Sequence, residues 1–70
     1  MRNDLYYFRR KKKISQTEMG NLLGTHYTNY MGRELGRTEF KLSEAKVVAD
    51  KLGITLDKMH ELLTSYETEG

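Results

Sequence analysis

The side chains with the most evident chemistry in this chain of 70 residues are cations. Residues 9–13 read Arg-Arg-Lys-Lys-Lys without interruption. Such a run suits either a polyanion or the solvated end of a helix. The first 13 residues carry six cations against one carboxylate, a net charge of +5, whereas residues 14–41 are neutral and residues 42–70 have a net charge of −3. The gradient favours a protein that presents its N-terminal end to a polyanion.

Residue types needed for most catalytic and metal-binding chemistry are scarce. The chain has no cysteine, and its two histidines, His26 and His60, are too few and too far apart for a histidine metal cluster. We find no acid–base pair in a recognisable motif, no nucleophile beside a base and no glycine-rich phosphate loop. We therefore expect a protein that is not an enzyme and that takes no metal, cofactor or small-molecule substrate.

Hydropathy gives an expectation about location. No window approaches the roughly 18 consecutive apolar residues of a membrane span. The N-terminus is charged almost at once, at Arg2 and Asp4, and lacks the apolar centre of a signal peptide. We therefore expect a cytoplasmic protein with no membrane partner.

The elements that must position these side chains are predicted to be helices. Apolar residues recur at helical spacing in blocks separated by turn signals, and proline and alternating strand patterns are absent. The blocks cover about 4–12, 15–24, 26–35, 43–52 and 55–63, followed by a tail, about 64–70, that we expect to fray. The pattern predicts one all-α domain over residues 1–70, a compact five-helix bundle.

Local signals mark the ends of the second block. Ser15 and Glu18 have the spacing of a capping box, in which each side chain bonds the other residue's backbone amide. Gly24 is placed to end the helix. Gly20 lies on its inner face, where a missing side chain lets the next helix approach closely.

The second and third blocks together predict a helix-turn-helix over about residues 15–36. The connection after Gly24 is too short for an antiparallel hairpin, so the two helices must cross steeply. Tyr30 is the apolar position that packs the second helix against the first. Four residues then face outwards: Tyr27, Thr28, Met31 and Gly32. A helix-turn-helix offers such a surface to the major groove of DNA.

With these features the chain resembles the phage-repressor and Cro-like (XRE-type) helix-turn-helix family, which has the lambda-repressor-like DNA-binding fold. The resemblance covers about Leu5–Leu63. Four segments match family motifs in order: Leu5-Tyr6-Tyr7-Phe8-Arg9, Ile14-Ser15-Gln16-Thr17-Glu18-Met19-Gly20-Asn21-Leu22-Leu23-Gly24, Glu34-Leu35-Gly36-Arg37 and Leu52-Gly53-Ile54-Thr55-Leu56-Asp57-Lys58-Met59.

The resemblance implies roles for individual residues. Tyr27, Thr28 and Gly32 correspond to base-reading positions, and Asn29 is a further partner for a base or phosphate. Gln16 corresponds to the family's phosphate-binding glutamine. The full set of expected phosphate contacts is Gln16, Thr17, His26, Arg10, Lys13, Arg37 and Lys41. His26, at the start of the third block, is also expected to be a partial helix cap.

The resemblance further implies that Arg9 and Glu34 form a structural ion pair between two helices. Three departures from the family pattern carry expectations of their own. Lys13 stands where glycine is usual, so it must adopt a left-handed backbone. Arg33 stands at an apolar position and must extend outwards or find a partner. Gly32 removes a base-reading side chain and lowers helix stability by about 1 kcal/mol relative to alanine.

The resulting hypothesis is a sequence-specific, DNA-binding transcriptional regulator that binds double-stranded DNA as a homodimer. The expected dimer or partner surface is the C-terminal helix with Leu62, Leu63 and Tyr66. Two alternatives remain open: an antirepressor that binds a partner repressor protein, and an antitoxin of the same fold. The atypical reading surface and the tyrosine-rich composition motivate the antirepressor alternative, whereas only the neighbouring genes could identify an antitoxin.

Overall fold

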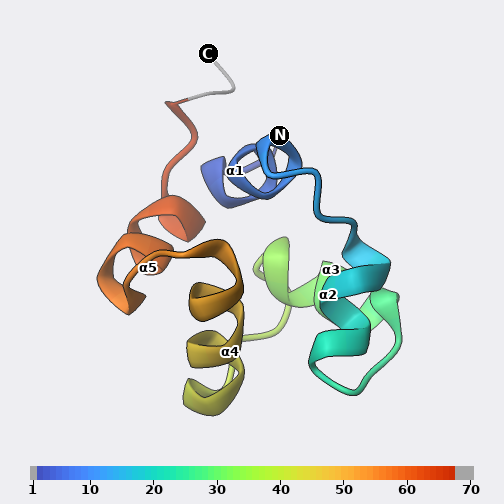
Figure 1. Ribbon diagram of the computed structural model, residues 1–70. Coiled ribbons are helices and arrows are strands. Elements are labelled where there is room, and N and C mark those ends of the chain that lie inside the picture. The colour runs from blue at the N-terminus through green and yellow to red at the C-terminus, as the bar shows by residue number, and fades with distance from the viewer. Residues whose placement is uncertain (1, 68–70) are drawn as a thin grey trace.

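The computed structural model describes residues 2–67, and in this part of the chain all regular structure is helical. Figure 1 shows helices in the order α1 (Asp4–Lys11), α2 (Gln16–Leu22), α3 (Tyr27–Glu34), α4 (Leu42–Leu52) and α5 (Leu56–Thr64). The radius of gyration, 10.8 Å, is close to the value of about 11 Å for a compact chain of this length. The predicted all-α fold with five helices is confirmed.

Helices α1, α2 and α5 begin at polar side chains that accept backbone hydrogen bonds. Asn3 accepts from the N–H of Tyr6, Ser15 from Glu18 and Thr55 from Lys58. These contacts satisfy amides that have no partner inside the helix. Of the capping box expected at Ser15, only the bond from the Glu18 N–H to the Ser15 side chain forms. The Glu18 carboxylate does not return to the Ser15 N–H, because it lies 3.2 Å from Lys51 Nζ.

Each helix contributes apolar side chains to one central core. The buried members are Leu5, Met19, Tyr30, Val48, Ala49, Leu52, Met59 and Leu62. Tyr30 is fully buried, as predicted. Leu62 is only 8% exposed, so the expectation that it belongs to an exposed dimer surface is wrong: the inner face of α5 packs it against the other helices.

The closest contact between helices is made by α2 and α3, which residues 23–26 connect. A Cβ atom added at Gly20 would lie 2.9 Å from Tyr27 Cα and 3.0 Å from Tyr27 N. Real Cβ atoms do not approach backbone so closely, so only glycine allows the first turn of α3 to rest on α2. The predicted role of Gly20 is confirmed.

The first residues of the chain are tied to its last helix. Asn3 Nδ2 donates to the carbonyl oxygens of Glu34, at 2.7 Å, and Leu63, at 3.2 Å. The N–H of Asp4 donates to Ser65 O, and Ser65 Oγ donates to Asp4 Oδ2, both at 2.8 Å. Of the tail expected to fray, Thr64 ends α5, Ser65 is held by these bonds, and residues 68–70 lie outside the described residues.

Helix length bears on membrane insertion. The longest described helix, α4, has 11 residues, and none of the helices in residues 2–67 has the length and apolar character that a bilayer crossing requires.

Candidate nucleic-acid interface

Helix α3 has one buried and one exposed face. Tyr30 and Glu34 point inwards and are 0% and 1% exposed. Tyr27, Thr28 and Asn29 are exposed, and Gly32 is half-buried. Of the four residues predicted to face outwards, Tyr27 and Thr28 therefore lie at the surface, whereas Met31 and Gly32 are half-buried. Nothing lies within 4 Å of a Cβ atom built on Gly32, so a side chain at this position would extend into open space.

Polar groups at the start of α3 are bonded to one another. The His26 ring nitrogen Nδ1 lies 3.0 Å from Thr28 Oγ1 and accepts from the Thr28 N–H at 3.4 Å. His26 is thus the partial cap that the sequence predicts. Asn29 Nδ2 donates to Thr25 Oγ1 at 2.6 Å. The exposed face presents Tyr27 and a set of short polar side chains that are already oriented by these contacts.

Below this face lies a buried ionic network. Arg9 Nε lies 3.0 Å from Glu34 Oε1, with side chains only 4% and 1% exposed, which confirms the expected pair. Arg9 Nη1 also donates to Ile14 O at 2.6 Å. Gln16 Nε2 donates to Glu34 Oε2 at 3.2 Å. The network joins α1, α2 and α3 and sets how the exposed face of α3 is held.

The position of Gln16 differs from the sequence-based picture of a side chain aimed at phosphate. Its amide is half-buried and bonded to Glu34. The motif places Gln16 in the first turn of α2 but contains no signal for this bond, because Glu34 lies 18 residues away.

Tyr30 lies against the same network. Its hydroxyl is buried and has no hydrogen-bond partner in the described structure. Burial, reinforced by the nearby Glu34 carboxylate, raises the pKa of Tyr30 far above its ordinary value, while Arg9 acts weakly in the opposite direction. The aromatic ring therefore anchors α3 as a neutral group over the whole physiological pH range.

Arg33 forms an ion pair. From the sequence it is expected either to extend outwards or to find a partner, and the second outcome is the one observed. Its Nε lies 2.9 Å from Glu44 Oε1, and its Nη1 donates to Asn29 O at 3.0 Å. The Lys41 N–H donates to the same Glu44 oxygen at 2.9 Å. This backbone bond, with Arg33, keeps the pKa of Glu44 below its usual value. The cluster ties the end of α3 to the start of α4.

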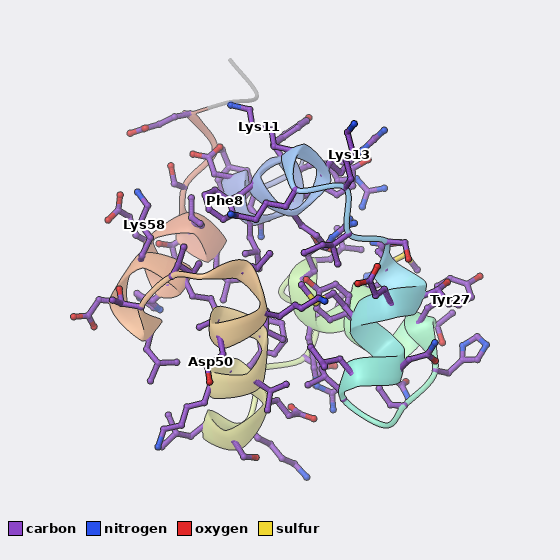
Figure 2. All side chains as sticks on the ribbon, in the orientation of Figure 1. Phe8, Lys11, Lys13, Tyr27, Asp50 and Lys58 are labelled. Carbon is purple, nitrogen blue, oxygen red and sulfur yellow. The ribbon has the colours of Figure 1, made fainter. Side chains whose placement is uncertain are left out.

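Ion pairing divides the cations into two groups. Those paired with carboxylates are Arg9, Arg33, Lys51 and Lys58. Those without an ion pair among residues 2–67 are Arg10, Lys11, Lys12, Lys13, Arg37, Lys41 and Lys46. The uncompensated charge is thus concentrated after α1 and after α3. In Figure 2, Lys13 and Tyr27 lie on one side of the molecule, and Asp50 and Lys58 on the other.

The backbone of Lys13 is left-handed, with φ of 60°, as expected at this position. The Lys13 N–H donates to Arg10 O at 2.9 Å and the Ile14 N–H donates to Arg9 O at 3.3 Å. This pattern ends a helix and usually has glycine in the left-handed position. Lys13 is exposed.

The remaining residues of the expected partner surface lie apart from α3. Leu63 is half-buried and Tyr66 is 46% exposed. Leu63 helps to line a surface cleft with a volume of about 350 Å³, together with Phe40, Leu56, Met59 and His60. Among residues 2–67, no three His, Asp or Glu side chains are grouped to hold a metal ion.

Comparison with known proteins identifies no relative of this chain. No family model, curated protein or solved structure matches it significantly. The interface must therefore be judged from its own geometry and charge.

Proposed function

We propose that the protein binds double-stranded DNA and regulates transcription in the manner of a small repressor or Cro-like protein. In this proposal α2 and α3 form a helix-turn-helix, and α3 enters the major groove. The observation that carries the proposal is the two-faced packing of α3. Tyr30 and Glu34 anchor one face, and the opposite face presents Tyr27, Thr28 and Asn29 to solvent.

The charge distribution supports the same reading. Cations without an ion pair among residues 2–67 precede and follow the α2–α3 unit in the sequence, at residues 10–13 and at Arg37 and Lys41, and in this proposal they contact phosphates on either side of the groove. The proposed phosphate contacts are Gln16, Thr17, His26, Arg10, Lys13, Arg37 and Lys41. Base contacts are assigned to Tyr27, Thr28, Asn29 and Gly32, where the missing side chain lets a base edge or a methyl group approach the helix backbone.

One recognition helix rarely gives enough affinity, so we propose that a homodimer reads two half-sites. Leu63 and Tyr66 remain candidates for its contact surface, whereas Leu62 lies in the core. We also propose a cytoplasmic location, which suits a regulator of the phage-repressor type.

The test is a mobility-shift assay on DNA from upstream of the protein's own gene. Wild type, Tyr27→Ala and Thr28→Ala are compared in the presence of unrelated competitor DNA. We expect each α3 variant to bind at least about fivefold more weakly, because one base contact contributes about 1–3 kcal/mol. Lys58→Gln, on the opposite side and paired with Glu61, is the matched control. Equal binding by all four proteins would contradict the proposal.

A second candidate function is that of an antirepressor that binds a repressor protein. It is favoured by exposed apolar side chains on helices other than α3: Leu42 in α4 is 65% exposed and Leu22 in α2 is 43% exposed. Co-purification with the repressor encoded beside it would distinguish the two functions. A complex that forms without DNA and survives Tyr27→Ala would favour the antirepressor.

A further inference from the structure

The segment that leaves α1 is the most strongly charged surface of the described chain. Arg10, Lys11, Lys12 and Lys13 are consecutive, exposed and without ion pairs among residues 2–67. Arg9, the fifth cation of the run, is neutralised by Glu34 in the interior. We call residues 10–13 the α1 exit.

One member of the α1 exit is already ordered. Arg10 Nη1 donates to Tyr6 Oη at 2.7 Å, and its guanidinium lies 5.4 Å from the centre of the Tyr6 ring. The Arg9 guanidinium also approaches this ring, at 5.3 Å. An arginine side chain that already rests on the ring of a tyrosine in the same helix is partly ordered. It therefore loses less conformational entropy when it binds an anion than a freely moving arginine side chain does.

Lys13 has a strained backbone conformation, and its side chain makes no hydrogen bond or ion pair within residues 2–67 that would explain why lysine stands there instead of glycine. Among the described residues it is the one non-glycine residue with a positive φ. The left-handed region costs a residue with a Cβ atom about 1–2 kcal/mol. The helix-ending hydrogen bonds use only backbone atoms of Lys13, so glycine would make the same bonds without strain. What glycine would lose is the ammonium group.

We propose that the α1 exit is a sequence-independent contact for the DNA phosphate backbone, separate from the reading face of α3, and that Lys13 keeps its strained backbone because its ammonium group binds a phosphate. The inference rests on the proposed DNA-binding function and divides it into two parts: α3 supplies sequence preference, and the α1 exit supplies salt-dependent affinity. A backbone that costs stability at a functional cation is the expected sign of such a division.

The experiment measures binding and stability on the same variants. Binding to a labelled duplex of mixed sequence, two helical turns long, is followed by fluorescence anisotropy over a series of salt concentrations. Thermal unfolding is followed without DNA. The variants are Lys13→Gly, which removes charge and strain, Lys13→Gln, which removes charge alone, and Lys58→Gln as the control on the far side (Figure 2).

We expect Lys13→Gly to raise the melting midpoint by about 4 °C while it weakens binding. Both Lys13 variants should reduce the log–log salt slope by about 0.9 and binding at 0.1 M salt by about eightfold, since affinity scales as salt concentration to about the power −0.9 for each phosphate contact. Lys13→Gln should leave the melting midpoint unchanged, and Lys58→Gln should leave the slope unchanged.

The inference is overturned if Lys13→Gly and Lys13→Gln keep the wild-type slope, or if Lys13→Gly fails to raise the melting midpoint. Binding of poly-glutamate as tight as that of the duplex, with the same dependence on Lys13, would also overturn it in favour of an acidic protein partner. The two proposals fail differently. If wild type binds neither the mixed duplex nor its own upstream DNA, both are wrong. If Tyr27→Ala weakens binding to upstream DNA but the Lys13 variants do not, only the present inference is wrong.

Discussion

At the residue scale, the interior of this small domain is unusually dependent on a few polar groups. Arg9 and Glu34 are buried together, Gln16 donates to the same carboxylate, and the Tyr30 ring packs beside them. Arg9, Glu34 and Tyr30 are buried and hold α3 in place from below, and the half-buried Gln16 supports them through its bond to Glu34. Substitutions here should change stability first and binding second.

Tyr30 should make the protein sensitive to alkali. Unfolded tyrosine loses its proton above about pH 10, whereas the raised pKa of buried Tyr30 keeps it protonated in the folded state. The unfolded state therefore binds fewer protons above pH 10, and the free energy of unfolding falls there by up to about 1.4 kcal/mol per pH unit. Below pH 10 both states are protonated and this effect is absent.

Tyr30→Phe should remove that loss. At pH 8 its free energy of unfolding should lie within about 1 kcal/mol of wild type, because the hydroxyl has no hydrogen-bond partner to lose. Urea unfolding followed by circular dichroism at several pH values from 8 to about 11.5 makes the comparison. Parallel curves for the two proteins would show that Tyr30 does not titrate differently in the folded state.

The Arg9–Glu34 pair should show strong coupling. Arg9→Met leaves the Glu34 carboxylate buried without its charge partner, and we expect a loss of about 3–5 kcal/mol. The double variant Arg9→Met/Glu34→Gln should be less destabilised than the sum of the two single variants, because neither charge then remains buried alone. Additive losses in urea unfolding would show that the pair is not an energetic unit.

At the element scale, the α2–α3 unit depends on glycine in one position and tolerates it in another. Gly20 lies where α3 approaches α2, and Gly32 lies on the open face of α3. Both are inside helices, so their intrinsic cost relative to alanine is similar, at about 1 kcal/mol. Only the surroundings differ, and the same substitution should therefore have opposite effects.

Gly20→Ala should destabilise the protein by about 1–3 kcal/mol, because its Cβ atom would meet the Tyr27 backbone at 2.9 Å and α3 would have to shift. Gly32→Ala should stabilise it by about 1 kcal/mol, since nothing lies within 4 Å of the added atom. Thermal unfolding of the pair provides the test. Stabilisation by Gly20→Ala would mean that the close α2–α3 contact is absent in solution, and destabilisation by Gly32→Ala would mean that the open space beside Gly32 is absent.

At the scale of the whole molecule, the chain is closed by its first few residues. Asn3 caps α1 through Oδ1 and bonds the ends of α3 and α5 through Nδ2. Asp4 and Ser65 add two further bonds between the same ends. In Figure 1, α1 lies across one end of the molecule, above α3 and beside α5. The basic α1 exit is therefore fixed in position relative to the exposed face of α3.

Asn3→Asp separates capping from this long-range role. Aspartate caps helices as well as asparagine does, so a residue that only capped α1 would tolerate the change. The carboxylate cannot donate to Glu34 O or Leu63 O, however, and we expect a loss of about 1–3 kcal/mol at neutral pH. Asn3→Ala, which loses the cap as well, should cost more. An unchanged urea midpoint for Asn3→Asp would show that Asn3 stabilises the protein only as the cap of α1.

Much of the fold follows from local signals in the sequence. Apolar spacing, the caps at Ser15 and Thr55, and the glycines predicted five helices close to their observed limits, because these signals act over three or four residues. The close contact at Gly20 was predictable for the same reason, because a short connection between two helices requires a small residue where they meet. The left-handed backbone at Lys13 was expected only from the resemblance, since the family usually has glycine at that position. Family resemblance added the Arg9–Glu34 pair, which local spacing could not reveal.

Tertiary structure alone decided which partners distant groups would find. Leu62 and Leu63 are equally apolar in sequence, yet only Leu62 is buried, because the neighbouring helices cover one face of α5. Gln16 bonds Glu34, Arg33 bonds Glu44 and Asn3 bonds the ends of two helices, all across long separations. The run of cations at residues 9–13 is the clearest example of what sequence and tertiary structure each determine. Its composition is visible at once, but the fold buries Arg9 against Glu34 and leaves residues 10–13 uncompensated, because ion pairing depends on which surfaces meet.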